Sequence, residues 1–245
     1  MKPFVLISTR PEDDVAEREH ESVLRFTGLD ERDLCRVRLE KEEAPVLRAD
    51  EVSGVILAGS PFTVSEPAET KSALELATEP KLFSVLDQVM AQDLPFLGAC
   101  YGVGALGTHQ GARIDRTYGE ELSAVEVTLT EEGLADPLVR AAGLPPVFTG
   151  LVGHKEAVHT LPATATVLAT GEACPVQMFR IGTRQYATQF HPEMDVPLLL
   201  ERAARYQEHG YFDPEQMDEL FGALGQQHAD EAPLLLRGFA EHFAR

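Results

Sequence analysis

Residues 95–104 read Pro-Phe-Leu-Gly-Ala-Cys-Tyr-Gly-Val-Gly, an apolar run that passes directly into a glycine-rich turn. The first part, Pro95–Ala99, is continuously apolar, which is typical of a strand covered by helices on both faces. A helical pattern follows the turn. The small residues Gly98 and Gly102 let the strand and the helix pack closely, while Cys100 takes a strained backbone. This order of strand, tight turn and helix predicts a nucleophile elbow.

Short apolar runs and helical patterns alternate on both sides of this stretch. The candidate strands are Phe4–Ile7, Cys35–Leu39 and Gly54–Leu57, and the candidate helices are Asp13–Phe26 and Pro80–Gln92. Strands that alternate with helices pair in parallel, because each helix carries the chain back across a face of the sheet. The sequence therefore predicts an α/β fold with an open, mostly parallel sheet flanked by helices.

The second half of the chain has a different pattern. Extended pieces at 124–129, 147–152, 166–169, 176–181 and 185–189 predict later strands and hairpins, with a turn at 181–184. Helical patterns follow at Val196–Glu208, Pro214–Ala223 and Ala232–Ala244, each with a proline near its first turn. We expect one compact α/β domain at 1–193 and a helical C-terminal extension at 194–245 packed on it. The extension either covers a sheet edge or makes a contact in a homo-oligomer.

Composition and charge exclude several classes of protein. The chain has 245 residues with 21 Lys and Arg against 40 Asp and Glu, for a net charge of −19. This acidic balance argues against nucleic-acid and membrane-surface partners, because phosphates find no basic surface. No apolar stretch approaches the ~20 residues of a membrane span, and the N-terminus lacks the features of a signal peptide. Three cysteines at irregular spacing suit a reducing compartment, so we expect a cytoplasmic protein.

The cysteine of the elbow is a candidate nucleophile. At the N-terminus of the following helix, the dipole and the free N–H groups favour the thiolate of Cys100 over the thiol. A buried structural cysteine before a glycine-rich turn is the alternative interpretation of this segment alone. Cys35, in an apolar strand, and Cys174, beside Pro175, are expected to be small packing residues.

A histidine and an acid follow a later candidate strand, where residues 189–193 read Gln-Phe-His-Pro-Glu. A cysteine nucleophile needs a base that takes its proton, and the base needs a third group that holds its tautomer. His191 and Glu193 supply these two partners. A lone histidine at a strand end is more often a surface or capping residue, but the presence of the elbow reverses that preference.

A third segment, residues 56–62, reads Ile-Leu-Ala-Gly-Ser-Pro-Phe and again passes from a strand into a tight turn. The N–H of Gly59, together with that of Tyr101, would form a two-donor hole for a developing oxyanion. Taken alone, this segment is only a loop.

Together and in this order, the three segments resemble class I glutamine amidotransferase domains, of the stand-alone type similar to the glutaminase part of GMP synthases. The resemblance covers about residues 4–193 and implies a flavodoxin-like fold. It implies Cys100 as the nucleophile, His191 as the base and Glu193 as its orienting carboxylate. The amides of Gly59 and Tyr101 would form the oxyanion hole.

A fourth segment strengthens the resemblance. Residues 153–158 read Gly-His-Lys-Glu-Ala-Val, which is similar to the family's His-x-Asp-x-Val segment. The resemblance makes Ser60, His154 and Gln189 candidate substrate-binding residues. By itself His154 fits a capping or surface histidine equally well.

The sequence departs from the family pattern after the nucleophile. The family usually reads Cys-x-Gly-His-Gln, where the last side chain helps to hold the substrate, but here those positions are Val103 and Gly104. Either another side chain substitutes, or the substrate differs, or glutamine binds weakly. The loss of one such hydrogen bond costs about 1–3 kcal/mol, which reduces efficiency without abolishing it.

The resemblance also implies a reaction and its partners. A γ-glutamyl thioester forms on Cys100, and ammonia leaves for a separate acceptor enzyme. We expect that acceptor to be a separate synthetase chain, because 245 residues leave no room for a fused one. The substrate is glutamine or another γ-glutamyl small molecule. No cofactor is expected, and no metal either, because the remaining histidines share no ligand spacing.

Other functions stay open. Val103 and Gly104 favour a hydrolase of another γ-glutamyl amide or peptide, which would keep the same nucleophile. A non-catalytic regulatory protein that retains the fold, acting as a subunit of a larger enzyme, is supported only by the altered elbow. Related chaperone and peptidase families share an elbow cysteine but lack the late His-Pro-Glu segment.

Overall fold

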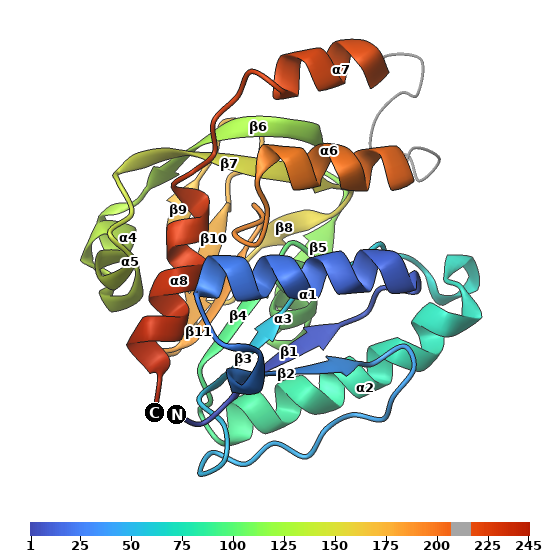
Figure 1. Ribbon diagram of the computed structural model, residues 1–245, viewed down its shortest axis with the longest axis vertical. Helices are drawn as coiled ribbons and strands as arrows, with labels where there is room; N and C mark the ends of the chain where they lie inside the picture. Colours follow the sequence, from blue (N-terminus) through green and yellow to red (C-terminus); the bar gives the residue numbers. More distant parts are fainter. Residues whose placement is uncertain (207–216) are drawn as a thin grey trace.

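The computed structural model describes residues 1–206 and 217–245, and its centre is a nine-stranded sheet (Figure 1). Its strands are β1 (Phe4–Ser8), β2 (Leu34–Arg38), β3 (Gly54–Leu57), β4 (Phe96–Ala99), β6 (Glu120–Leu129), β7 (Val147–His154), β9 (Ala165–Thr170), β10 (Met178–Ile181) and β11 (Gln185–Thr188). Their order across the sheet is β2-β1-β3-β4-β11-β10-β9-β6-β7. The pairs from β2 to β11 are parallel, and those from β11 to β7 are antiparallel. The predicted α/β fold, with parallel strands flanked by helices, is confirmed.

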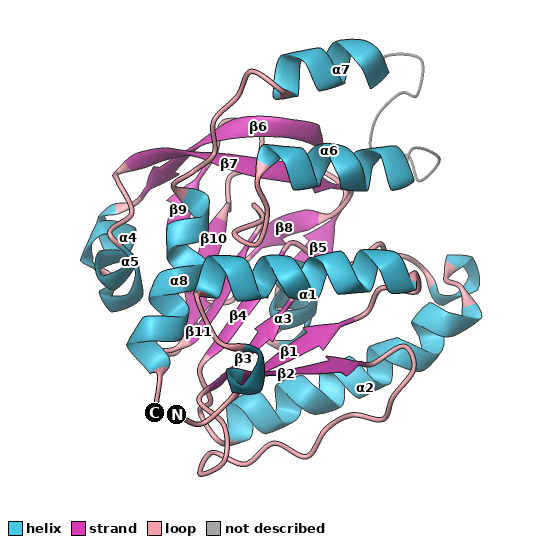
Figure 2. Ribbon diagram, in the orientation of Figure 1, coloured by secondary structure: helices cyan, strands magenta, loops and turns pink. Residues whose placement is uncertain are grey.

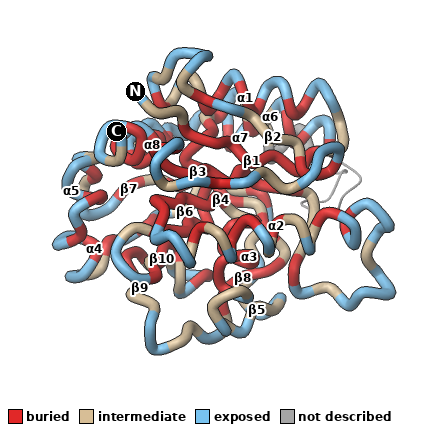
Figure 3. Tube along the Cα trace, turned by 90° about the horizontal axis from the view of Figure 1, so that it is seen from below, coloured by how far each residue is buried: buried red, intermediate tan, exposed pale blue. Residues whose placement is uncertain are grey.

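Helices cover both faces of the parallel strands (Figure 2). They are α1 (Asp13–Thr27), α2 (Ala73–Ala91), α3 (Tyr101–His109), α4 (Glu131–Ala135), α5 (Pro137–Ala142), α6 (Val196–Arg205), α7 (Met217–Leu224) and α8 (Ala232–Phe243). Side chains of β1 alternate between the two faces: Phe4 lies in one core with Phe239 of α8, and Val5 in the other with Leu86 of α2. The strands β1, β3 and β4 are buried along their whole length (Figure 3). This double burial explains why these strands are apolar at every position.

Two short strands and two short α-helices were not predicted. The strands β5 (Arg113–Asp115) and β8 (Ala157–Thr160) form a separate antiparallel pair, and α4 and α5 follow the end of β6. Elements this short show no repeat of apolar positions, so sequence periodicity does not reveal them.

The helix α2 starts at Ala73, although the sequence predicts a start at Pro80. The hydroxyl of Ser72 accepts a hydrogen bond from the N–H of Glu75 at 3.1 Å, which caps the N-terminus of the helix. Pro80 lies inside the helix, and the buried residues on either side of it, Thr78 and Leu82, share one face of the helix. Tertiary packing therefore outweighs the proline as a boundary signal.

The C-terminal helices have two different positions. Leu235 and Phe239 of α8 belong to the main core beside α1, and Lys2 donates a backbone hydrogen bond to Arg245 at 2.7 Å, which brings the termini together (Figure 1). In contrast, α6 and α7 pack with β6 and β7 in a smaller core. The predicted helices at 196–208 and 214–223 lie partly outside the described residues. The domain boundary at residue 193 stays a prediction.

One expectation for the cysteines is wrong. Cys174 is buried as predicted, but Cys35 is exposed. The reason is that β2 is the edge strand of the sheet, where a side chain can point to solvent on an open side. Within the described residues, we find no helix with the length and apolar character that a membrane crossing needs.

Candidate active site

Cys100 lies between β4 and α3, at the carboxyl end of the parallel strands. Its backbone has φ 48° and ψ −86°, a conformation that residues other than glycine rarely adopt. Strand and helix approach so closely that a Cβ on Gly98 would lie 2.8 Å from the Cα of Gly102. This is the geometry of a nucleophile elbow, and it presents the thiol at the edge of the sheet.

The charge state of the Cys100 thiol differs from the expectation. Burial raises the pKa of the thiol to about 12, and the carboxylate of Glu193 acts in the same direction. Arg10 lowers this pKa but does not offset the burial. The predicted preference for a thiolate at the helix N-terminus is wrong, because burial disfavours the charged form and the nearby carboxylate of Glu193 adds to that effect. At neutral pH the side chain of Cys100 is therefore predominantly a neutral thiol.

His191 and Glu193 follow β11, the strand that pairs with β4, so both reach the same sheet edge as Cys100. The Nδ1 atom of His191 lies 2.7 Å from Oε1 of Glu193. This contact assigns the proton to Nδ1 and leaves Nε2 with a free lone pair. Burial lowers the pKa of His191, and the raising influence of Glu193 does not cancel it. At neutral pH the imidazole is therefore uncharged, which is the form that accepts a proton.

Two arginines and a second glutamate surround this pair. Burial alone would raise the pKa of Glu193, but His191 and Arg202 outweigh it and lower the pKa to about 2. The guanidinium of Arg202 lies 3.8 Å from Glu193 and 3.9 Å from Glu19. Arg10 pairs with Glu19 at 2.7 Å, and all four side chains are buried. The carboxylate of Glu193 is thereby held ionised beside the imidazole.

The sequence did not predict Arg202 as a residue of the site. It lies on α6, where an arginine on an amphipathic helix is expected to face solvent. The fold turns it inward because α6 covers the pocket beside His191. Glu19 and Arg10 were missed for the same reason, since nothing in their local sequence distinguishes them from surface charges.

The turn after β3 packs directly on the histidine. A Cβ on Gly59 would lie 2.7 Å from Cε1 of His191, so only glycine fits between this turn and the ring. Tyr101 is the first residue of α3, and its N–H has no acceptor within the helix. The turn and the helix start thus lie on either side of Cys100, and the oxyanion-hole role of their amides stays a prediction.

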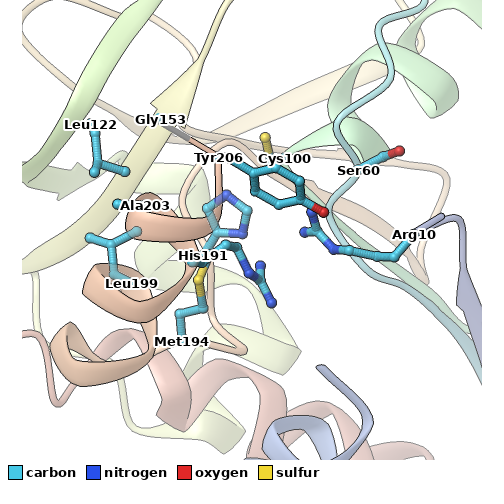
Figure 4. A pocket seen from close by; sticks show the side chains of 11 residues that line it. Arg10, Ser60, Cys100, Leu122, Gly153, His191, Met194, Leu199, Ala203 and Tyr206 are labelled. Carbon is cyan, nitrogen blue, oxygen red and sulfur yellow. The ribbon is translucent and has the colours of Figure 1, made fainter. Parts of the chain in front are cut away.

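Two cavities meet at Cys100. The first, which we call the α6 cavity, contains His191 and is lined by Leu122, Leu199 and Ala203 opposite Arg10 and Ser60 (Figure 4). The second, which we call the β7 cavity, is lined by side chains from the turn after β3 and from the end of β7. Its lining residues are Ser60, Phe62, Thr63, Cys100, Tyr101, Gly153, His154, Lys155 and Glu156. Ser60, Cys100 and Gly153 line both cavities, so the thiol lies at their junction.

The candidate substrate-binding residues separate into two groups. Ser60 and His154 line the β7 cavity, whereas Gln189 is buried and lines neither cavity. His154 is already engaged, with Nε2 2.9 Å from the Glu120 carboxylate and Nδ1 3.0 Å from the carbonyl of Glu156. The Oγ of Ser60 accepts one hydrogen bond, from the N–H of Phe62 at 3.1 Å, and its O–H can still donate, so the geometry favours Ser60 over His154 as a substrate contact.

His154 also belongs to the one group of potential metal ligands within the described residues. Ligand atoms of Glu120, His154 and Cys174 lie within 4.8 Å of one another. The Glu120 carboxylate accepts hydrogen bonds at 2.9 Å from His154 and at 2.7 Å from Gln177. Hydrogen bonding among protein groups therefore accounts for this cluster.

Glu156 gives a physical reason for the departure from the family pattern at Gly104. Its carboxylate accepts hydrogen bonds from the N–H groups of Val64 at 2.9 Å and Ser65 at 2.7 Å. The same carboxylate lies so close to α3 that a Cβ on Gly104 would be 2.4 Å from Oε1. A glutamine side chain has no room there, because Glu156 occupies the space to hold the loop after β3.

This contact predicts that Gly104→Ala destabilises the protein. The added methyl group would push against a carboxylate that is tied to two backbone N–H groups, so we expect a loss of about 1–3 kcal/mol in unfolding free energy. Gly102→Ala, in the same helix, is the matched control, because its Cβ would meet only Leu57 at 3.8 Å. Urea denaturation of both variants checks this; equal stability of the two would contradict the role of Glu156.

The protein thus has an α/β fold in which the parallel strand β4 ends in a cysteine elbow, at the same end of the sheet as a buried His–Glu pair. A family model described as glutamine amidotransferase class-I matches residues 29–197, and the chain belongs to this family.

The chain is also similar to particular members. It is 31% identical over 143 residues to a glutamine-hydrolyzing GMP synthase of Elusimicrobium minutum, which covers 58% of this chain but 25% of that protein. It is 27% identical over 175 residues to one subunit of the glutamine-hydrolyzing GMP synthase from Thermoplasma acidophilum, covering 71% of this chain and 76% of that relative. A solved glutamine amidotransferase from Thermotoga maritima shares the fold, with a TM-score of 0.75 at 20% identity over 99% of this chain and 98% of that one.

Proposed function

We propose that the protein hydrolyses the γ-carboxamide of glutamine, or of a related γ-glutamyl compound, through a thioester on Cys100. The observation that carries this proposal is the junction of the two cavities. There a neutral thiol on a strained elbow shares a cavity with a histidine whose Nδ1 is fixed by Glu193 at 2.7 Å. Membership of the class-I glutamine amidotransferase family supports the same reaction class.

The reaction begins with proton transfer from the Cys100 thiol to Nε2 of His191. The sulfur attacks the γ-carbonyl carbon, and the amides of Gly59 and Tyr101 stabilise the resulting oxyanion. The C–N bond then breaks while the imidazolium gives its proton to the leaving nitrogen, which departs as ammonia. Water, activated by the neutral His191, hydrolyses the thioester to glutamate and regenerates the thiol. Glu193 stabilises the imidazolium throughout, because its pKa of about 2 keeps it ionised.

We further propose that the ammonia passes to a separate enzyme. One relative is named as one subunit of a GMP synthase, which supports a division of the reaction between chains. The release step can be tested without knowing the acceptor, because free ammonia accumulates when none is present.

The test of the proposed function is direct. The protein is incubated with glutamine, and glutamate and ammonia are measured together, while a rapid acid quench and mass spectrometry look for a γ-glutamyl adduct on the peptide that contains Cys100. A chloroketone analogue of glutamine should label the same residue. Absence of both adduct and labelling, with folding confirmed by circular dichroism, would refute the proposal.

The electrostatics of the site predict an acid limb in the pH profile. Below its pKa, His191 is protonated and cannot accept the thiol proton, so kcat/KM falls as the pH is lowered. Because burial lowers this pKa, the midpoint of the limb should lie below the ordinary histidine value of 6.5. Glu193 raises the pKa of His191, so in Glu193→Gln the midpoint should move to still lower pH.

On the alkaline side we expect a plateau. The thiol pKa of about 12 keeps the thiolate population small, so kcat/KM should not rise between about pH 7 and pH 9. The measurement is kcat/KM for glutamine from about pH 4.5 to pH 9 in buffers of constant ionic strength. A rise that continues above pH 8 would show that the free thiolate, rather than the Cys–His pair, reacts.

A further inference from the structure

The lining of the α6 cavity is more apolar than the release of ammonia requires. Leu122, Met194, Leu199 and Ala203 line it, and all four are buried. Ammonia is small and polar and gains nothing from such a lining. The β7 cavity, in contrast, has no aliphatic side chain in its lining: Thr63, Lys155 and Glu156 lie there with the aromatic rings of Phe62 and Tyr101. The two sides of the thiol therefore differ in chemistry.

The position of His191 assigns the two cavities to the two halves of an amide substrate. The leaving nitrogen must receive its proton from His191, so it lies on the side of the thiol where that ring is. His191 lines the α6 cavity and not the β7 cavity. The γ-glutamyl half therefore extends into the β7 cavity, and any substituent on the leaving nitrogen enters the α6 cavity.

A buried cation without hydrogen-bond partners lies in the same cavity. Arg202 is 9% exposed, and its Nε, Nη1 and Nη2 atoms form no hydrogen bond with the part of the chain that the structure describes. The carboxylates of Glu19 and Glu193 lie at 3.9 and 3.8 Å, beyond hydrogen-bond length. A buried guanidinium with unused N–H groups is costly unless an acceptor completes it, and a carboxylate matches its geometry.

We propose that the preferred substrate is a γ-glutamyl amino acid with an apolar side chain. This inference rests on the proposed function and specifies its substrate class. The apolar side chain of the leaving amino acid packs against Leu199 and Ala203 of α6, and its carboxylate accepts hydrogen bonds from Arg202. The sulfur of Cys100 forms a bond to the γ-carbon, the C–N bond breaks, and the nitrogen leaves with the proton from His191 as a free amino acid. Water then releases glutamate and restores the thiol.

The test compares three substrates that share the γ-glutamyl half. They are glutamine, γ-glutamyl-leucine and γ-glutamyl-3-methylbutylamide, which is γ-glutamyl-leucine without its carboxylate. For the wild-type protein we expect kcat/KM for γ-glutamyl-leucine to exceed that for glutamine at least about tenfold, because its side chain fills the α6 cavity. The 3-methylbutylamide should fall between them, because it lacks the group that Arg202 binds.

Variants on α6 test whether the leaving amino acid binds in the α6 cavity. Ala203→Val narrows the cavity and should lower the ratio of kcat/KM for γ-glutamyl-leucine over glutamine at least about tenfold. Ala204→Val, on the exposed side of the same helix, carries the same change outside the cavity and should leave that ratio as in the wild type. Arg202→Gln should bring γ-glutamyl-leucine and the 3-methylbutylamide to equal kcat/KM, whatever its effect on the absolute rates.

The outcomes separate this inference from the proposed function. If Cys100-dependent turnover of glutamine is found but γ-glutamyl-leucine is no better a substrate, the inference is wrong and the proposed function stands. If no γ-glutamyl compound is turned over and Cys100 is not labelled, both are wrong. The inference is also overturned if Ala203→Val and Ala204→Val show the same ratio of kcat/KM for γ-glutamyl-leucine over glutamine, because the leaving group would then lie elsewhere.

Discussion

Replacing Cys100 by alanine should abolish turnover of glutamine and of every γ-glutamyl amide. The proposed reaction passes through a covalent thioester, and within the described residues Cys100 is the one cysteine that lines the two cavities. Loss of a nucleophile in this kind of catalytic unit costs about 10⁴-fold to 10⁶-fold in kcat. Cys100→Ser should lose nearly as much, because a hydroxyl is a poorer leaving and attacking group in this position.

The chain supplies its own control for this experiment. Cys35→Ala removes an exposed thiol on the edge strand β2, far from the functional site in the sheet order, and should leave kcat unchanged. Steady-state assays of ammonia release, together with thermal unfolding curves, compare the three variants with the wild type. A Cys100→Ala protein that folds and keeps more than about 1% of the wild-type rate would refute the covalent route.

Replacing His191 by asparagine should have the second largest effect. Asparagine keeps a donor toward Glu193 but offers no base to the thiol, whose pKa is about 12. General-base catalysis contributes about 10²-fold to 10⁴-fold, and the high thiol pKa places the loss at the upper end of this range near neutral pH. The variant must use the small population of free thiolate. Its rate should therefore rise about tenfold for each unit of pH, unlike the plateau expected of the wild type.

His109→Asn is the matched control, because His109 also pairs with a carboxylate, that of Asp87 at 2.9 Å, but it lies at the C-terminal end of α3 and lines neither cavity. It should keep the wild-type rate and pH profile. Rates for both variants are measured from about pH 6 to pH 9.5. A His191→Asn profile as flat as that of the wild type would show that another group deprotonates Cys100.

The sequence by itself determined the scaffold and the order of the reactive groups. The apolar runs at β1, β3 and β4 predicted strands buried on both faces, and the Gly-x-Cys-x-Gly turn predicted the elbow at Cys100. His191 and Glu193 were predicted as a pair because a cysteine elbow needs a base and an acid that orients it, and the structure places their side chains 2.7 Å apart. These features depend on residues close together in the chain, and local backbone preferences and strand periodicity can be predicted over such short distances.

Only the tertiary structure decided which charges surround the site and how they act. Arg202 and Glu19 come from helices at opposite ends of the chain, and their burial beside His191 follows from packing that no local pattern records. The contact of Glu156 with Gly104, the exposure of Cys35 and the raised pKa of the Cys100 thiol have the same origin. Burial and electrostatic interactions depend on neighbours that are distant in sequence, so they exist only once the chain has folded.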